Sequence, residues 1–406
     1  MLKKIKLYLK KSRFFYYFCK GVIVYSLLIS SYIISFISKF FPLKSNRILF
    51  RAYEGRGYTC NPKAISECIL SNTNEYEIIW AFKEPEKFLY LKERNIRLVK
   101  VYSLKYYYYY ISSAVLVFND FWSSFIRPRK KQIFLNTWHG SGALKCVGLC
   151  TMPHKVDKLL YNMRHAFGYL ICGCRKFTEI REMSFGKHII DLEIGLPRND
   201  IFFKTDLVKT QFVSKIRNEL GINISSKIIL YAPTYRENFE NELYGLDIPN
   251  ILNALKKKFG GEWILLVRGH YFNKAASSEN IDNFVIDVSD YGDMQDLLLT
   301  ADVLITDYSS SSWDFGLQQK PCFLYMPDIE SYKKDFSFYN PIECLPYPQA
   351  ETNKELVENI VGFNYESFRS KLFEFYTDFG SFDDGSASEE IYEFIVNHKR
   401  YICDES

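Results

Sequence analysis

The chain has 406 residues, of which 48% are hydrophobic and 24% are charged. This composition excludes an intrinsically disordered protein and is sufficient for two packed domains. The net charge of +5 is placed unevenly, because residues 1–53 contain eleven Lys and Arg but no Asp or Glu. These basic residues are interleaved with aromatic and aliphatic ones, so they indicate an anionic membrane surface as partner and no nucleic acid.

The first predicted element is the uncharged run 21–38, which lies between Lys20 and Lys39. Its 18 residues reach only the lower limit for a membrane-spanning helix, and five of them are serines. Basic residues at both ends favour a segment that lies in the membrane interface. We therefore expect residues 1–44 to form membrane-associating helices, which place the protein as a peripheral or monotopic protein on the cytoplasmic face of the cell membrane. A single spanning helix is the alternative.

Beyond this segment, short apolar runs alternate with helix-length spacers, which is typical of parallel strands buried on both faces. The predicted strands cover 46–50, 76–82, 115–118 and 132–136, and then 227–232, 263–267, 284–287, 302–306 and 322–325. Two such series predict an α/β protein with two Rossmann-like domains, 45–205 and 225–385, followed by a C-terminal helix, 386–406. The tyrosine run 106–110 is expected to form an amphipathic helix with one buried face.

Polar segments stand where four of these strands end, which is where open α/β sheets bind ligands. The first contains His139 and Gly140. A histidine can accept a proton near neutral pH, so His139 suits activation of an acceptor hydroxyl. A turn with a hydrogen-bonded histidine is equally compatible with the spacing.

Two further strand ends carry candidate phosphate contacts. Thr234 follows the strand 227–232, and Arg268 and His270 follow the strand 263–267. Arg268 and His270 are two residues apart, so an extended chain places them on one side, where they suit a pyrophosphate. A structural role for Arg268 is the alternative.

The fourth segment, 302–312, joins a strand to a predicted helix through several hydroxyl residues. Its candidate ligand-binding residues are Thr306, Asp307, Ser309 and Ser310. Free backbone N–H groups and serine hydroxyls at a helix start favour phosphate. A carboxylate repels phosphate, so Asp307 is expected to orient the loop or pair with a cation. The sequence has no metal-ligand spacing and no Walker loop, so neither a bound metal nor a cofactor is expected.

Taken together, these segments resemble the CDP-glycerol glycerophosphotransferase family, which includes teichoic-acid primases and polymerases. The resemblance covers about Arg47 to Ile395 and follows the order of the family's motifs. The matching segments are 48–65, 138–140 with Leu144, Lys145 and Gly148, 195–200, 231–234, 268–270, 305–310 and 384–389.

The resemblance implies a GT-B-like fold in which the donor lies between an acceptor-side domain and a CDP-donor domain. It implies that His139 is the general base, that His270 contacts the donor pyrophosphate, and that Ser309 and Ser310 contact phosphate. The implied reaction transfers glycerol phosphate from CDP-glycerol to a hydroxyl, with release of CMP. The implied acceptor is a polyprenyl-diphosphate-linked saccharide or a polyol phosphate, in teichoic-acid or capsule-type synthesis.

The sequence departs from the family pattern at two places, which bear on the identity of the substrate more than on the class of reaction. The loop 140–144 is one residue longer than the usual form and lacks its proline, and Tyr271 stands where a proline normally follows the histidine. CDP-ribitol or another CDP-alditol is therefore an alternative donor. A GT-B nucleotide-sugar glycosyltransferase and an inactive membrane-bound scaffold are more distant alternatives, and retention of His139 and His270 argues against the scaffold.

Overall fold

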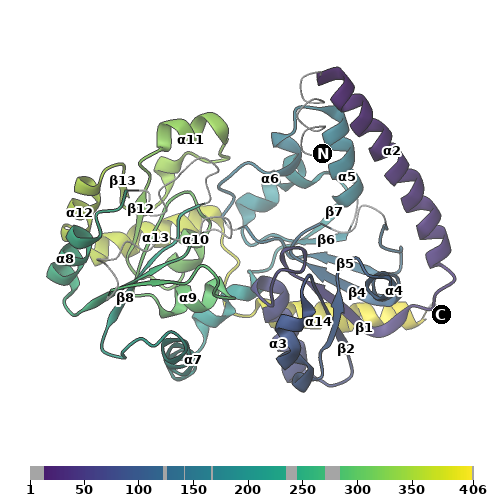
Figure 1. Ribbon diagram of the computed structural model, residues 1–406, viewed down its shortest axis with the longest axis horizontal. Helices are drawn as coiled ribbons and strands as arrows, with labels where there is room; N and C mark the ends of the chain where they lie inside the picture. Colours follow the sequence, from purple (N-terminus) through teal and green to yellow (C-terminus); the bar gives the residue numbers. More distant parts are fainter. Residues whose placement is uncertain are drawn as a thin grey trace.

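The chain forms two α/β lobes that lie side by side, each built on a parallel sheet (Figure 1). The computed structural model describes residues 13–121, 126–140, 142–165, 168–234, 245–269 and 284–404. The two Rossmann-like domains predicted from the alternating apolar runs are confirmed.

The first lobe contains a seven-stranded sheet with the order β3-β2-β1-β4-β5-β6-β7. Its strands are β1 (Lys44–Arg51), β2 (Glu77–Phe82), β3 (Arg97–Lys100), β4 (Ser113–Phe118), β5 (Ile133–Asn136), β6 (Gly168–Ile171) and β7 (Ile189–Leu192). The helices are α3 (Cys60–Asn72), α4 (Leu104–Ser112), α5 (Lys155–His165) and α6 (Arg175–Phe185). The central strand β1 is buried on both faces, since Ile48, Leu49 and Phe50 are all fully buried, as expected for a parallel sheet covered by helices.

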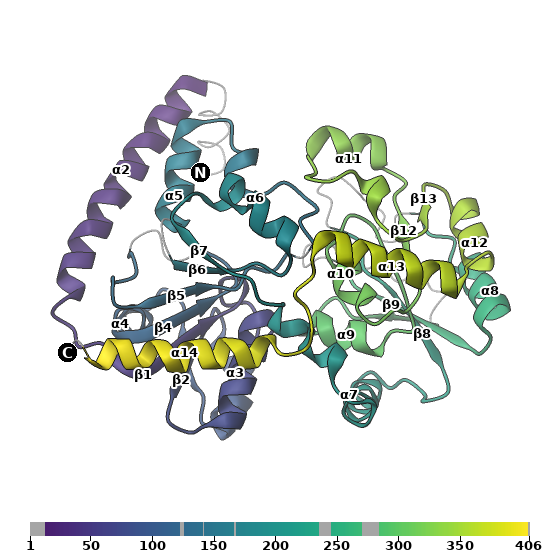
Figure 2. The same cartoon turned by 180° about the vertical axis from the view of Figure 1, so that it is seen from behind.

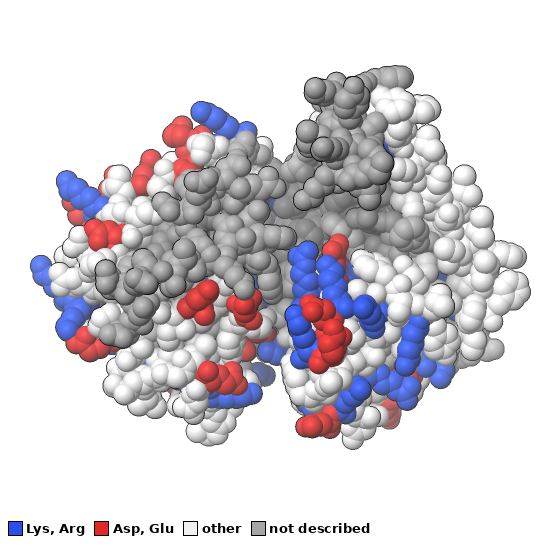
Figure 3. Space-filling model, viewed as in Figure 1, with Lys and Arg blue, Asp and Glu red and all other residues white. Residues whose placement is uncertain are grey.

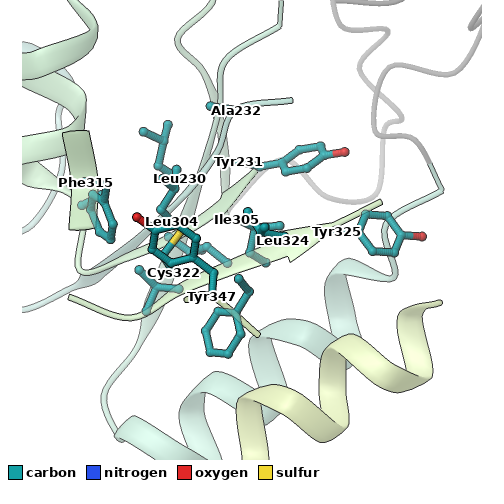
Figure 4. Close-up of a cluster of buried hydrophobic side chains, with 14 of the residues drawn as sticks. Leu230, Tyr231, Ala232, Leu304, Ile305, Phe315, Cys322, Leu324, Tyr325 and Tyr347 are labelled. Atoms are coloured by element: carbon teal, nitrogen blue, oxygen red, sulfur yellow. The ribbon is translucent and has the colours of Figure 1, made fainter. Parts of the chain in front are cut away.

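The second lobe contains a six-stranded sheet with the order β10-β9-β8-β11-β12-β13. Its strands are β8 (Lys227–Tyr231), β9 (Trp263–Val267), β10 (Val285–Asp287), β11 (Val303–Thr306), β12 (Cys322–Tyr325) and β13 (Gln349–Ala350). The helices are α7 (Asp206–Glu219), α8 (Ile248–Phe259), α9 (Met294–Thr300), α10 (Ser311–Gly316), α11 (Ile329–Asp335), α12 (Asn353–Val361) and α13 (Tyr365–Phe379). Leu230, Ile305 and Leu324, from three adjacent strands, lie together in the core of this lobe (Figure 4).

Both sheets reverse their strand order once, and the position of the reversal determines where a ligand can enter. In the first sheet the order turns between β1 and β4, and in the second it turns between β8 and β11. Connections from the two neighbouring strands then leave toward opposite faces of the sheet, which opens a crevice at their carboxyl ends. The two crevices belong to different lobes.

The last helix, α14 (Ala387–Asp404), returns from the second lobe and crosses the first (Figure 2). Ile391 and Ile395 are fully buried in the core of the first lobe. The Asp200 carboxylate accepts hydrogen bonds from the backbone N–H groups of Ala387 at 3.2 Å and Ser388 at 2.7 Å, so it satisfies free donors at the helix start. The C-terminus therefore ties the two lobes together a second time.

The tyrosine run 106–110 lies in α4, where Tyr106, Tyr109 and Tyr110 are buried. This confirms the predicted amphipathic helix with one buried face. The short strands β3, β6, β7 and β13 were not predicted. The polar stretch 202–226 contains α7, and the domain boundaries placed from the sequence stay predictions.

The N-terminal helix α2 (Arg13–Ser38) lies along the outside of the first lobe (Figures 1 and 2). The ring of Tyr17 stacks on His154 at 3.4 Å, and Lys20 pairs with Asp157 of α5. Val24 is buried. Within the described residues, Phe15–Ser38 is the one helical segment long and apolar enough to cross a membrane.

Candidate active site

A cleft of about 560 Å³ lies between the two lobes, at the carboxyl ends of both sheets. It brings together most of the site residues predicted from the sequence. The predicted residues that line it are His139, Gly140, Thr234, Arg268, Ser309 and Ser310. Thr306 and Asp307 lie behind the lining, and His270 lies outside the described residues.

His139 follows β5 and is held in one tautomer by the backbone. Its Nδ1 lies 2.8 Å from the carbonyl oxygen of Asn119, which can only accept a hydrogen bond. Nδ1 must therefore carry the proton when the ring is neutral, and Nε2 is then free to accept one. Burial lowers the pKa of His139, and the positive charge of Arg198 lowers it further. The ring is therefore a neutral base near pH 7.

The loop that carries His139 is fixed by Asn61, which is fully buried at the start of α3. The Asn61 side-chain amide donates to the carbonyl oxygens of Thr137 at 3.0 Å and Trp138 at 3.2 Å. Trp138 has a φ of 50°, a left-handed conformation that is costly for a residue with a side chain. The Asn61 contacts hold the loop in this conformation.

On the opposite side of the cleft, the ends of β8 and β11 are joined by Thr234 and Asp307. The Asp307 carboxylate accepts hydrogen bonds from the Thr234 backbone N–H at 2.9 Å and from its hydroxyl at 2.6 Å. Thr306 is fully buried, and its hydroxyl donates to the carbonyl oxygen of Ala232 at 2.7 Å. Asp307 thus holds the loop at Thr234, and Thr306 lies behind the cleft at the end of its strand.

Ser309, Ser310 and Ser311, in the serine run after β11, line the cleft. The Ser309 hydroxyl accepts from the Ser311 hydroxyl at 3.0 Å and from the Ser311 backbone N–H at 3.3 Å. The Ser310 side chain makes no capping bond to α10. α10 has only six residues, so its helix dipole is short.

A buried ion pair connects the two sides of the cleft. Arg198, in the segment 195–200 of the first lobe, places Nε 2.9 Å from Oδ2 of Asp314 in α10 of the second. The same guanidinium donates to the carbonyl oxygen of His139 at 2.9 Å. Gln295 and Asn199 also donate to the Asp314 carboxylate, at 2.9 and 3.1 Å. One network therefore joins the histidine loop to the helix behind the serine run.

Two further contacts fix the lobes relative to one another. The Asp293 carboxylate accepts from the Lys63 ammonium at 2.7 Å and from the Thr59 hydroxyl at 3.1 Å. Gly142, with a φ of +68°, lies so close to Trp313 that an added Cβ would stand 2.3 Å from the indole ring. The cleft is therefore bounded by a packed interface.

Sequence reasoning missed Arg198, Asp314, Asn61 and Asp293 as site residues. Arg198 and Asn61 lie in segments that resemble family motifs, but neither follows a predicted strand directly. A signal was present in the segment 195–200, where Arg198, Asn199 and Asp200 follow a glycine, a leucine and a proline. Arg198 and Asp314 are 116 residues apart in the chain, so their pairing could not be predicted from the sequence.

Comparisons with known proteins agree with this geometry. The family model described as CDP-glycerol:poly(glycerophosphate) glycerophosphotransferase matches residues 33–397. A teichoic acid poly(glycerol phosphate) polymerase of Bacillus spizizenii is 31% identical over 390 residues, which cover 91% of this chain and 97% of that protein. A teichoic acid glycerol-phosphate transferase of Staphylococcus aureus is 29% identical over 86% of this chain and 92% of its own.

Among solved structures, the wall teichoic acid polymerase TagF superposes with a TM-score of 0.78 at 30% sequence identity. The match covers 95% of this chain and 98% of that chain. Relatives named for ribitol phosphate also match the chain. The GT-B-like arrangement of two parallel-sheet domains is confirmed by the TagF match.

Asp314→Asn tests the central ion pair. The substitution leaves the Arg198 guanidinium buried without its counter-charge, so we expect a loss of about 3–5 kcal/mol in the free energy of unfolding. Glu67→Gln is the matched control, because Glu67 pairs with Arg94 where both side chains are partly exposed; it should cost at most about 1 kcal/mol. Equal losses in urea unfolding would contradict a special role for the Arg198–Asp314 pair.

Proposed function

The chain belongs to the CDP-glycerol:poly(glycerophosphate) glycerophosphotransferase family, and on this premise we propose that it transfers glycerol phosphate from CDP-glycerol to a hydroxyl of a teichoic-acid-type acceptor, with release of CMP. The observation that carries the proposal is the position of His139. It is a neutral base with its acceptor nitrogen available, in a cleft whose other wall contains Ser309, Ser310 and Arg268.

In the proposed reaction, Nε2 of His139 removes the proton from the acceptor hydroxyl. The resulting oxygen attacks the phosphorus that carries glycerol, and the bond from that phosphorus to the CMP oxygen breaks. Positioning and electrostatic stabilisation supply most of the rate enhancement in phosphoryl transfer. The fixed tautomer of His139 is therefore more useful than a flexible histidine would be, since the base needs no reorientation.

Charge on the departing CMP requires stabilisation from the second lobe. We assign this role to Arg268, to the hydroxyls of Ser309 and Ser310, and to His270 as the family resemblance implies. Arg268 follows β9, and the serines follow β11. Because β8 separates these two strands in the sheet, their ends approach a diphosphate from two directions. Thr234 supports the same surface through its bonds to Asp307.

The donor alditol has one alternative with a specific observation behind it. Relatives named for ribitol phosphate match the chain at 27% and 28% identity, so a CDP-ribitol donor fits the same chemistry. A screen of purified protein with both donors separates the two. A nucleotide-sugar glycosyltransferase would instead leave both phosphates on the nucleotide and release no CMP.

We also propose that α2 lies in the membrane interface, so that a lipid-linked acceptor can reach the cleft from the cytoplasmic side. The outward side chains of α2 are apolar and form an uncharged flank of the molecule (Figure 3). Tyr17 and Lys20 hold the same helix against α5 through His154 and Asp157. A spanning helix would carry these contacts into hydrocarbon, where an unsolvated carboxylate is costly, so they support an interfacial helix.

His139→Ala and His270→Ala test the catalytic assignment. We expect each variant to release CMP from CDP-glycerol about 10²–10⁴ times more slowly in the presence of a lipid-linked acceptor, because general base and charge stabilisation are lost. His188→Ala is the matched control, since His188 is exposed and does not line the cleft. Near-normal CMP release by both active-site variants would overturn the mechanism.

The pH dependence tests the state of His139. Burial lowers its pKa below the ordinary value of 6.5, so the neutral base is already the main form at pH 6.5. We expect kcat/KM to rise with pH in the acid range and to reach its plateau by about neutral pH. An acidic limb with its midpoint above 6.5 would show that His139 is not the neutral base described above.

Paired glutamates on α2 test the interfacial placement. Ile29 and Ile33 are exposed and lie one turn apart on one face of α2. We expect Ile29→Glu with Ile33→Glu to reduce flotation with phosphatidylglycerol vesicles about tenfold or more, because apolar burial and anionic attraction are both weakened. Phe373→Glu, on α13 of the second lobe and 74% exposed, should float as the wild type does. An unchanged double variant would argue against the anchor.

A further inference from the structure

Four basic residues line the cleft, and they do not all lie on its second-lobe wall. Among the described residues, its lining includes Arg56, Lys145, Arg198 and Arg268 but only one acidic residue, Asp314. Arg198 is neutralised by Asp314. Arg268 belongs to the second lobe, and the Lys145 ammonium lies over the Tyr332 ring of α11 at 5.2 Å, so both of these cations lie against that wall.

Arg56 differs from the other three. It is exposed, it belongs to the first lobe, and it makes no ion pair with any residue in the described part of the chain. Its position is tied to the base, because its backbone N–H donates to the carbonyl oxygens of Ala52 at 3.2 Å and Tyr53 at 3.3 Å. The Tyr53 ring meets the His139 ring at a centroid distance of 5.4 Å. Arg56 thus stands one turn of chain away from a residue that contacts His139.

The turn that presents Arg56 is rigid. Tyr53 and Glu54 have φ values of 46° and 55°, a strained conformation that persists only where the surroundings enforce it. The Tyr53 backbone N–H donates to the Asn119 side chain at 2.8 Å, and the Glu54 backbone N–H donates to Asp120. Asn119 is the same residue whose carbonyl oxygen fixes His139. Base and cation are therefore positioned by one strand end, that of β4.

We propose that Arg56 binds the phosphodiester of the acceptor, next to the terminal hydroxyl that His139 deprotonates. The inference rests on the proposed function and deepens it by naming the residue that recognises the acceptor, a chain end that already carries a polyol phosphate. A guanidinium can hold a phosphodiester through two parallel hydrogen bonds. A hydroxyl and its nearest phosphodiester are one glycerol unit apart in such an acceptor, and Arg56 and His139 line the same cleft.

The test compares two synthetic acceptors. One is an alkyl-linked di(glycerol phosphate) with a free terminal hydroxyl, and the other has an uncharged methylphosphonate in place of the terminal phosphodiester. Wild type, Arg56→Gln and Arg56→Lys are each assayed for CMP release from CDP-glycerol. Lys92→Gln is the matched control, because Lys92 is an exposed cation of the first lobe that does not line the cleft.

With the phosphodiester acceptor, we expect Arg56→Gln to raise the acceptor KM about tenfold, as loss of a charge-assisted contact implies. The KM for CDP-glycerol should not change, Arg56→Lys should recover part of the loss, and Lys92→Gln should behave as the wild type. With the methylphosphonate acceptor, wild type and Arg56→Gln should be equal, because the charge that Arg56 recognises is missing.

An equal loss on both acceptors, or no loss on the phosphodiester acceptor, would overturn the proposal. Binding of the di(glycerol phosphate) by calorimetry without CDP-glycerol decides the point independently of turnover. Weaker binding by Arg56→Gln than by wild type supports the subsite, and equal binding rejects it. Absence of CMP release by the wild type would instead reject the donor assignment, so the two failures are distinguishable.

Discussion

Arg198 and Asp314 carry opposite charges where water is nearly excluded, since each side chain is only 5% exposed. Removing either charge from water costs several kcal/mol, and the pair recovers this only if its geometry and its additional hydrogen bonds are good. Asn199 and Gln295 supply those bonds to Asp314, and the His139 carbonyl oxygen accepts one from Arg198. All of these hydrogen bonds form only when the two lobes meet in one arrangement. That arrangement determines the shape of the cleft.

The same network links the two halves of the chemistry. Arg198 holds the backbone of the loop that carries His139, and its charge helps to keep the imidazole neutral. Asp314 belongs to α10, which follows the serine run of the donor side. A change in the contact between the lobes would alter the position of His139 and that of the serine run together. Such shared support is suited to a direct transfer, in which acceptor oxygen and donor phosphorus must be aligned at the same time.

The sequence predicted the fold wherever burial is continuous along a strand. β1, β4, β8, β9, β11 and β12 are buried apolar runs, and each was located. β3 and β7 are short edge strands with charged or exposed residues, β6 begins at Gly168, and β13 has two residues, so none produced a clear pattern. The ends of predicted strands likewise pointed to His139, Thr234 and Ser309 as candidate site residues. Asn61 and Arg198 hold the loop that carries His139, and Asp314 pairs with Arg198. These three residues lie far apart in the chain, so chain position alone does not show that they meet.

Backbone strain is distributed unequally across the cleft. In the described part of the lining, the non-glycine residues with positive φ are Tyr53, Cys60, Trp138 and Ala143, with values of 46°, 64°, 50° and 48°. All four belong to the first lobe, and the rings of Tyr53 and Trp138 contact that of His139. Strain of this kind costs of order 1–3 kcal/mol per residue and is retained at sites where position matters more than stability. The second-lobe wall is built differently, with Thr234, Ser309 and Ser310 at strand ends. The backbone around His139 is therefore the more strained of the two walls. This is consistent with a reaction in which one attacking hydroxyl must be placed accurately.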